Sequence, residues 1–254
     1  MLKEFTVGKM HVRCFETRKE MGDVSAFDGA KAINEVIAKK GEANVIFAAA
    51  PSQNDVLASL CEDKTVDWTK VNAFHMDEYI GLPEDAPQGF GNFLKAAIFG
   101  KLPFKSVNYL KGGAPDIDAE IARYEKLLTE NKPDIVFMGI GENGHIAFND
   151  PAVAHFDDNC LVKKVGLDDI CRQQQVNDGC FATINDVPTH ALTLSIPALM
   201  LPEYIFCIVP APTKANAVKD TCLGIITEKV PATILRIHEK SELYLDKDSG
   251  KYIL

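Results

Sequence analysis

The chain has 254 residues, 46% of them hydrophobic and 25% charged, with a formal net charge of −9 at pH 7. This length is enough for one large hydrophobic core and short for two, so we expect a single domain over residues 1–254. The acidic balance, without any cluster of Lys and Arg, excludes the basic surface that a nucleic-acid-binding protein needs.

Membrane and metal signals are missing from the sequence. No signal peptide opens the chain and no apolar run approaches the ~20 residues that span a bilayer, so we expect a cytoplasmic protein that does not engage membranes. The 7 cysteines are scattered without a Cys-x-x-Cys pair, and the 6 histidines show no His-x-x-x-His spacing. We therefore expect reduced thiols and no bound metal.

The first third of the chain predicts the start of an α/β fold. Residues 4–16 alternate loosely and predict one or two strands at a sheet edge. A helix is expected from an N-cap at Ser25 to a stop at Gly41, and residues 44–50 form the first continuous apolar strand. The turn after this strand carries Ser52 and Gln53 at a predicted helix start. Such a turn either binds phosphate through free N–H groups or is an ordinary N-cap.

A second buried strand is predicted over residues 71–76 and is followed at once by Asp77 and Glu78. Paired acids at this position either cap a turn or hold a base against a carbon next to a carbonyl group. Residues 83–91 form a Gly/Pro-rich loop suited to lining or covering a site. A short helix over residues 92–99, an edge strand over 106–110 and a helix over 117–131 are expected next.

The central feature is the strand at residues 134–138, which ends in the glycine-rich loop 139–151. Ligands of open α/β sheets bind at the carboxyl ends of strands, and this loop carries Asn143, His145 and Asp150 there. Its Gly-x-Gly-x-x-Gly spacing also invites a dinucleotide-binding reading. That reading fails, because Pro151 ends any helix within two turns of the third glycine, Gly144.

The last hundred residues supply further strands and two candidate cations. A capped helix over residues 168–175 carries Arg172, which either reaches a ligand or lies on a solvated face. Strands are expected over 191–196 and 204–209, and a strand pair over 231–245. Lys214 stands in the first turn of a helix, where the helix dipole disfavours a cation, so a nearby anion would rationalise it. The strand–helix alternation predicts a Rossmann-like three-layer α/β/α sandwich around a mostly parallel sheet.

Two segments also carry a family resemblance. Residues 139–151 and 74–83 resemble the two signatures of the glucosamine-6-phosphate deaminase (isomerase) family, a sister of the 6-phosphogluconolactonases. The resemblance implies ammonia release from an amino sugar 6-phosphate, a hydrolase-type and ketose-forming reaction without a cofactor, in a possible homo-oligomer. It implies that Asp77 is the base and that His145 assists ring opening, supported by Asp150 and Asn143. It also implies six substrate-binding residues: Ser52, Gln53, Glu78, Gly144, Arg172 and Lys214.

The sequence departs from that family at the reactive loops. Relatives have a glycine-rich phosphate loop where residues 50–54 contain no glycine, Asp where Asn143 stands and Glu where Asp150 stands. The amide at 143 removes a charge that favours imidazolium, so we expect His145 to protonate less readily than in relatives. Two alternatives stay open: lactone hydrolysis of the 6-phosphogluconolactonase type, and non-catalytic binding of a sugar phosphate.

Overall fold

The computed structural model describes all residues from Met1 to Leu254. Its centre is an eight-stranded sheet in which every neighbouring pair is parallel except β1 and β2. In spatial order the strands are β1 (Lys3–Val7), β2 (Met10–Phe15), β11 (Ser241–Asp246), β10 (Tyr204–Val209), β7 (Ile135–Met138), β3 (Ala43–Phe47), β4 (Val71–His75) and β6 (Ser106–Asn108). This arrangement confirms the predicted mostly parallel sheet, with the predicted edge strands β1 and β6 at its two edges.

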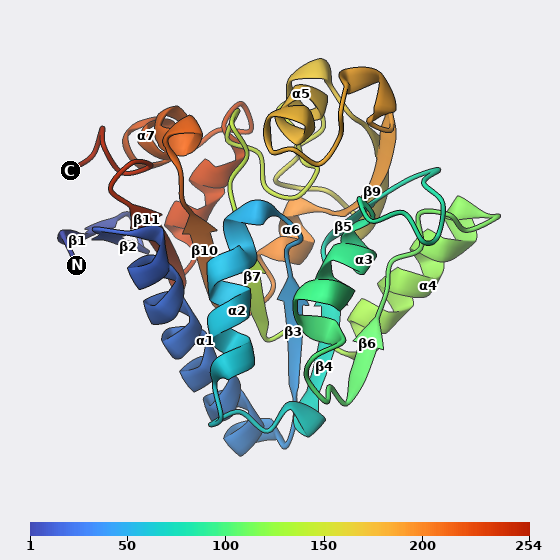
Figure 1. Cartoon of the computed structure of the whole chain (residues 1–254), viewed down its shortest axis with the longest axis horizontal. Coiled ribbons are helices and arrows are strands. Elements are labelled where there is room, and N and C mark those ends of the chain that lie inside the picture. The colour runs from blue at the N-terminus through green and yellow to red at the C-terminus, as the bar shows by residue number, and fades with distance from the viewer.

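Helices cover both faces of the sheet (Figure 1). One face packs against α1 (Arg18–Lys40), α2 (Asn54–Glu62) and α3 (Phe90–Leu94), which continues into a π-helix at Lys95–Phe99. The other packs against α4 (Ile117–Glu130), α6 (Ile196–Leu199) and α7 (Ala215–Leu223). Successive residues of a strand alternate between the two layers, so Phe47 and Phe137 enter the first core and Ile46 and Val136 the second. The fold is therefore the expected three-layer α/β/α sandwich.

The start of α1 differs from the sequence prediction. The N-cap is Thr17, whose hydroxyl accepts a hydrogen bond from the Glu20 N–H at 3.1 Å, and not Ser25. Ser25 lies inside the helix and donates to the Gly22 carbonyl at 3.0 Å. Gly22 lets α1 pack closely against α2 in these first turns, since a Cβ there would lie 2.5 Å from the Asp55 Cβ. The predicted stop is confirmed, since Gly41 closes the helix with φ 88°.

A second, three-stranded sheet stands above the carboxyl ends of the first. It consists of β5 (Asp77–Tyr79), β9 (His190–Leu194) and β8 (Val162–Gly166), all antiparallel neighbours. The sequence did not predict β8, because Lys163 and Lys164 interrupt its apolar pattern. Above this sheet lies α5 (Asp169–Asn177), at the top of the molecule in Figure 1.

The predicted strand pair at residues 231–245 is wrong in its first half. Pro231–Ile237 is a 3₁₀ helix, and only Ser241–Asp246 forms a strand, β11. Pro231 begins the helix, where a missing N–H is harmless, and the segment packs against α7.

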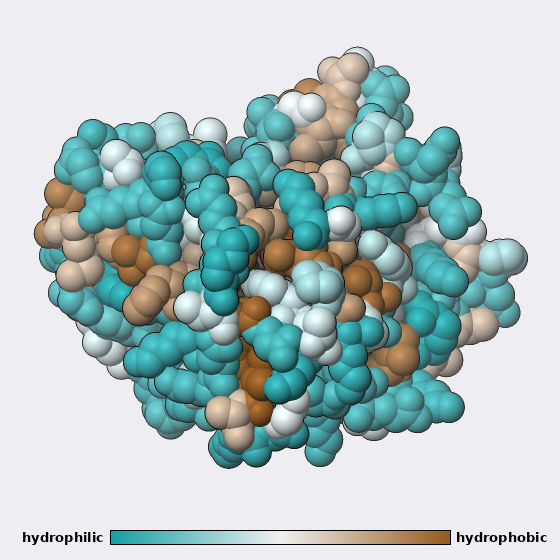
Figure 2. Space-filling model, turned by 60° about the horizontal axis from the view of Figure 1, so that its bottom comes forward, coloured by the Kyte–Doolittle hydropathy of each residue, from teal (hydrophilic) through white to brown (hydrophobic).

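The surface seen from below is mainly polar. In Figure 2 hydrophilic side chains cover most of this face, and hydrophobic ones reach it only in small areas. None of the helices combines the length and the apolar character that crossing a membrane requires.

Candidate active site

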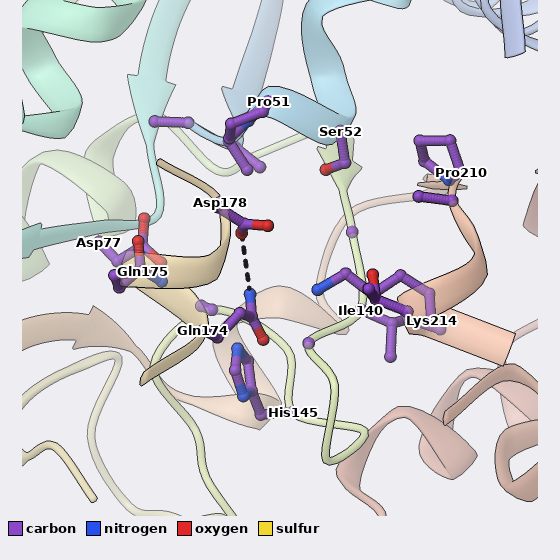
Figure 3. Close-up of a pocket in the computed structure, with 18 of the residues that line it drawn as sticks. Pro51, Ser52, Asp77, Ile140, His145, Gln174, Gln175, Asp178, Pro210 and Lys214 are labelled. Carbon is purple, nitrogen blue, oxygen red and sulfur yellow. Dashed lines mark hydrogen bonds between the residues drawn. The ribbon is translucent and has the colours of Figure 1, made fainter. Parts of the chain in front are cut away.

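A cavity of about 130 Å³ opens where four strands of the large sheet end. The segments that follow β3, β4, β7 and β10 all line it, and they contribute residues 48–52, 76–77, 139–141, 210–211 and 213–214. Asp77 and His145 both face this cavity (Figure 3). The predicted convergence of these strand ends, and of these two residues, is confirmed.

Strand β9 holds the two reactive segments next to each other. Thr193 of β9 pairs with Asp77 of β5. The Thr193 hydroxyl also accepts a hydrogen bond from the Phe148 N–H at 3.1 Å, and the Asn149 side chain donates to the Leu194 carbonyl at 2.8 Å. The acid and the imidazole, distant in sequence, are thus tied to one strand.

Asp77 has the environment of a strong carboxylate base. The residue is only 6% exposed, and its carboxylate accepts no hydrogen bond from the protein. Burial, and then the nearby charge of Glu78, raise the pKa of Asp77 well above its usual value. A carboxylate of raised pKa takes up protons readily once it is ionised.

His75 fixes the backbone at Asp77. Its Nδ1 lies 2.9 Å from the Asp77 carbonyl, and its Nε2 accepts the Leu110 N–H at 2.9 Å. Nδ1 therefore carries the proton of a neutral imidazole, and burial lowers the pKa of His75 to about 4. The Tyr124 hydroxyl holds the backbone of His75 itself. It accepts a hydrogen bond from the His75 backbone N–H at 3.0 Å and donates one to the His75 carbonyl at 2.8 Å.

His145 presents one nitrogen to the cavity. Its Nδ1 lies 2.8 Å from Asn143 Oδ1 and 2.9 Å from Asp150 Oδ1, while the Asn143 amide donates to Asp150 at 2.8 Å. Nδ1 therefore carries a proton, and Nε2, which has no protein partner, faces the cavity. Burial acts to raise the pKa of Asp150, but hydrogen bonds from His145 and Asn143 outweigh it and lower that pKa. Asp150 stays ionised behind the ring.

The loop backbone is shaped around this imidazole. A Cβ at Gly141 would overlap the His145 ring, and Gly144 has φ +86°. Two alanines that line the cavity also have positive φ, Ala147 at 51° and Ala211 at 85°. Such strained backbone positions concentrate at functional sites.

One group of side chains has the composition of a metal site. Ligand atoms of His145, Asp150 and Cys171 lie within 4.8 Å of one another. In this group the His145 Nδ1 proton already bridges to Asp150. Burial, and then the charge of Asp150, raise the pKa of the Cys171 thiol strongly, so the thiol stays protonated. With a protonated thiol and an Nδ1 proton held by Asp150, the three residues do not offer the lone pairs that a metal ion needs.

The far end of the cavity is polar. Lys214 is only 5% exposed and has no carboxylate within 4 Å of its ammonium nitrogen, which points into the cavity (Figure 3). Burial lowers its pKa, while the charges of Asp178 and Glu142 act to raise it. Ser52 lines the same end, as the sequence predicted.

Several predicted substrate-binding residues do not line the cavity. Glu78 turns away from it and accepts the N–H groups of Tyr79, Phe90 and Gly91 at 2.9, 3.0 and 2.8 Å. Arg172 also lies outside, since its guanidinium donates to the carbonyl groups of Ile184 at 2.6 Å and Val187 at 3.2 Å.

Gln53 and Gly144 do not line the cavity either. Gln53 is buried, and its amide donates to Ser52 and to the Ile208 carbonyl at 3.1 Å each. The cavity instead gains residues that the sequence analysis missed: Arg18 from α1, and Gln174, Gln175 and Asp178 from α5 and its end.

The Rossmann-like fold, together with a buried carboxylate and an imidazole at the carboxyl ends of parallel strands, defines a class of enzymes that move protons on small polar ligands. Residues 16–244 match the family described as glucosamine-6-phosphate isomerases/6-phosphogluconolactonase. The chain belongs to this family.

Individual relatives agree over nearly the whole length. A glucosamine-6-phosphate deaminase of Listeria welshimeri is 35% identical over 228 residues, which cover 89% of this chain and 95% of the relative. One of Bacillus cytotoxicus is 32% identical over 240 residues, 94% of this chain and 88% of the relative.

Solved structures give the same picture. A monomeric glucosamine-6-phosphate deaminase superposes with a TM-score of 0.86 at 27% identity, over 94% of this chain and 98% of the other. The 6-phosphogluconolactonase of Thermotoga maritima superposes with a TM-score of 0.77 over 94% of this chain and 100% of the other. At 19% identity it supports the fold alone.

Proposed function

We propose that this protein is a glucosamine-6-phosphate deaminase, which converts an amino sugar 6-phosphate into fructose 6-phosphate and ammonia. The observation that carries the proposal is the shared cavity, into which Asp77 presents an unpartnered carboxylate and His145 a free Nε2. The relatives named above support the choice of substrate class.

Ring opening uses His145. Its Nε2 moves a proton at the ring oxygen of the bound pyranose, while Asp150 stays ionised and stabilises the charge that passes through the imidazole. Asn143 orients the ring through its side-chain oxygen. The open-chain aldose then carries an amino group at C2.

Isomerisation uses Asp77. Its carboxylate removes the proton from C2 and returns it to C1 through an enolamine, which gives a ketose imine. Water adds at C2 and the carbon–nitrogen bond breaks with release of ammonia. Water is consumed in the last step, yet isomerisation comes first, so "ketose-forming deamination" describes the reaction better than "hydrolase".

The phosphate group belongs at the opposite end, near Lys214 and Ser52. A buried ammonium group without a carboxylate partner binds an anion favourably. Arg18 lies at the same end, with Nε 2.6 Å from Asp55 and Nη2 2.8 Å from the Pro51 carbonyl. Its guanidinium steadies the turn that carries Ser52.

Two measurements test this function. Ammonia release is followed with the 6-phosphates of glucosamine, galactosamine and mannosamine, and the product formed in deuterium oxide is analysed at C1. We expect ammonia together with deuterium at C1, because only isomerisation exchanges that proton with solvent. Lactone hydrolysis without ammonia release would assign the chain to the alternative activity, and binding without turnover would make it a sensor.

A further inference from the structure

Asp178 places a carboxylate at the end of the cavity where the proposed phosphate group lies. It follows α5, its N–H donates to the Gln174 carbonyl at 2.8 Å, and its side chain points into the cavity (Figure 3). The Gln174 amide reaches toward it at 3.5 Å. Gln174 is held in turn by the Glu142 N–H, which donates to its oxygen at 2.8 Å.

Two charged side chains at this end stand where the dipole of the adjoining helix disfavours their charge. The acid Asp178 stands at the carboxyl end of α5, and the base Lys214 precedes the amino end of α7, positions that the helix dipoles disfavour. They face the same cavity without forming an ion pair within 4 Å. Their placement is better explained by a ligand that contacts both than by local helix stability.

The polar end has no surplus of positive charge. The guanidinium of Arg18 is paired with Asp55. Lys214 is then the one remaining cation there, and it is balanced by Asp178, with Glu142 as a further carboxylate nearby. The other titratable groups on the cavity, Asp77 and His145, belong to its reacting end. A phosphate dianion at this end would meet Lys214 and a repelling carboxylate together.

We propose that Asp178 is a specificity-determining residue that makes this end of the cavity favour the monoanion of the substrate's phosphate group over the dianion. A phosphoryl group that has taken up a proton donates a hydrogen bond to the Asp178 carboxylate while accepting one from Lys214. A phosphate dianion has no proton to donate. The inference rests on the proposed function for the orientation of the sugar, and it concerns only the end remote from the reacting carbons.

The test compares three variants with the wild type. Asp178→Asn removes the charge and keeps the shape, and Asp178→Ser removes it with a smaller side chain. Asp169→Asn is the matched control, since Asp169 is an acid of the same helix whose side chain is 87% exposed. Binding of inorganic phosphate is measured by calorimetry at about pH 8 and about pH 5.5, on either side of the range in which phosphate esters gain a proton. The relative kcat/KM for glucosamine and glucosamine 6-phosphate is measured alongside.

Both Asp178 variants should bind phosphate at least roughly tenfold more tightly than wild type at the higher pH, with a smaller gain at the lower pH. Their kcat/KM ratio should shift toward the phosphorylated sugar, mainly through KM. Unchanged or weaker phosphate binding in both variants, or an equal gain in Asp169→Asn, would overturn the inference. If no sugar releases ammonia but phosphate binding still tightens, the proposed reaction fails and the role of Asp178 stands.

Discussion

Replacing Asp77 by Asn should abolish turnover and stabilise the fold. The carboxylate is buried, receives no hydrogen bond and has a strongly raised pKa, so its ionised form is unfavourable in the folded protein. Asparagine keeps the shape and removes the charge. We expect kcat to fall at least roughly 10²–10⁴-fold, the contribution of a positioned base.

The expected gain in stability depends on pH. Because the folded pKa of Asp77 lies above the unfolded value of about 3.9, the wild type loses stability as pH rises from that value to the folded pKa. The variant avoids this loss. The free energy of unfolding of the variant should equal that of the wild type at low pH and exceed it by ~1–3 kcal/mol above the folded pKa. This gain corresponds to about 3–9 °C in Tm for a protein of this size.

Asp150→Asn is the matched control, for which we expect the opposite change in stability. The pKa of Asp150 is lowered, so its carboxylate stabilises the fold above the unfolded pKa and this contribution is lost as pH falls through the folded value. Thermal denaturation of both variants between about pH 4 and 8 should give curves that diverge from wild type in opposite directions. An Asp77→Asn protein that is less stable than wild type at pH 8, or that turns over within tenfold of it, would refute the reasoning.

Three further substitutions probe the cavity walls. Gly141→Ala should push the His145 ring aside and lower kcat, measured by ammonia release, with near-native circular dichroism; native kcat would contradict this. Glu78→Gln should cost ~2–3 kcal/mol in urea unfolding, because the amide cannot accept all three N–H groups that the carboxylate now accepts; unchanged stability would count against it. Lys214→Met should raise KM for the phosphorylated sugar at least roughly tenfold and leave kcat nearly unchanged; an unchanged KM would remove Lys214 from the phosphate end.

The sheet and the reacting end could be predicted because local patterns encode them. Continuous apolar runs followed by glycine or by paired acids mark where parallel strands end, and that edge is where the cavity lies. The apolar pattern does not predict the second sheet, since β8 has two lysines in its middle. The role of β9 in joining Asp77 to the His145 loop depends on pairing between distant segments, which periodicity does not reveal.

Residues at the polar end were missed for two separate reasons. A helix predicted to start at Ser25 leaves Arg18 outside it, although Thr17 and Glu20 have the spacing of a capped helix start. Gln174, Gln175 and Asp178 lie on a segment without a clear apolar face, and only long-range packing of α5 over the cavity brings them to it. The resemblance implies a ligand role for Arg172, but its guanidinium instead holds the chain after α5 through the carbonyl groups of Ile184 and Val187.

The two ends of the cavity are supported differently, and this separates chemistry from selectivity. Asp77 and His145 are fixed by strands β4, β5, β7 and β9 through backbone hydrogen bonds and a neutral His75. Asp178 follows a nine-residue helix that contacts the large sheet little. We therefore expect substitution of Asp178 to change the distal group that is accepted, whereas substitution of Cys171, a residue of α5 that lies beside His145 and Asp150, should disturb the reacting groups.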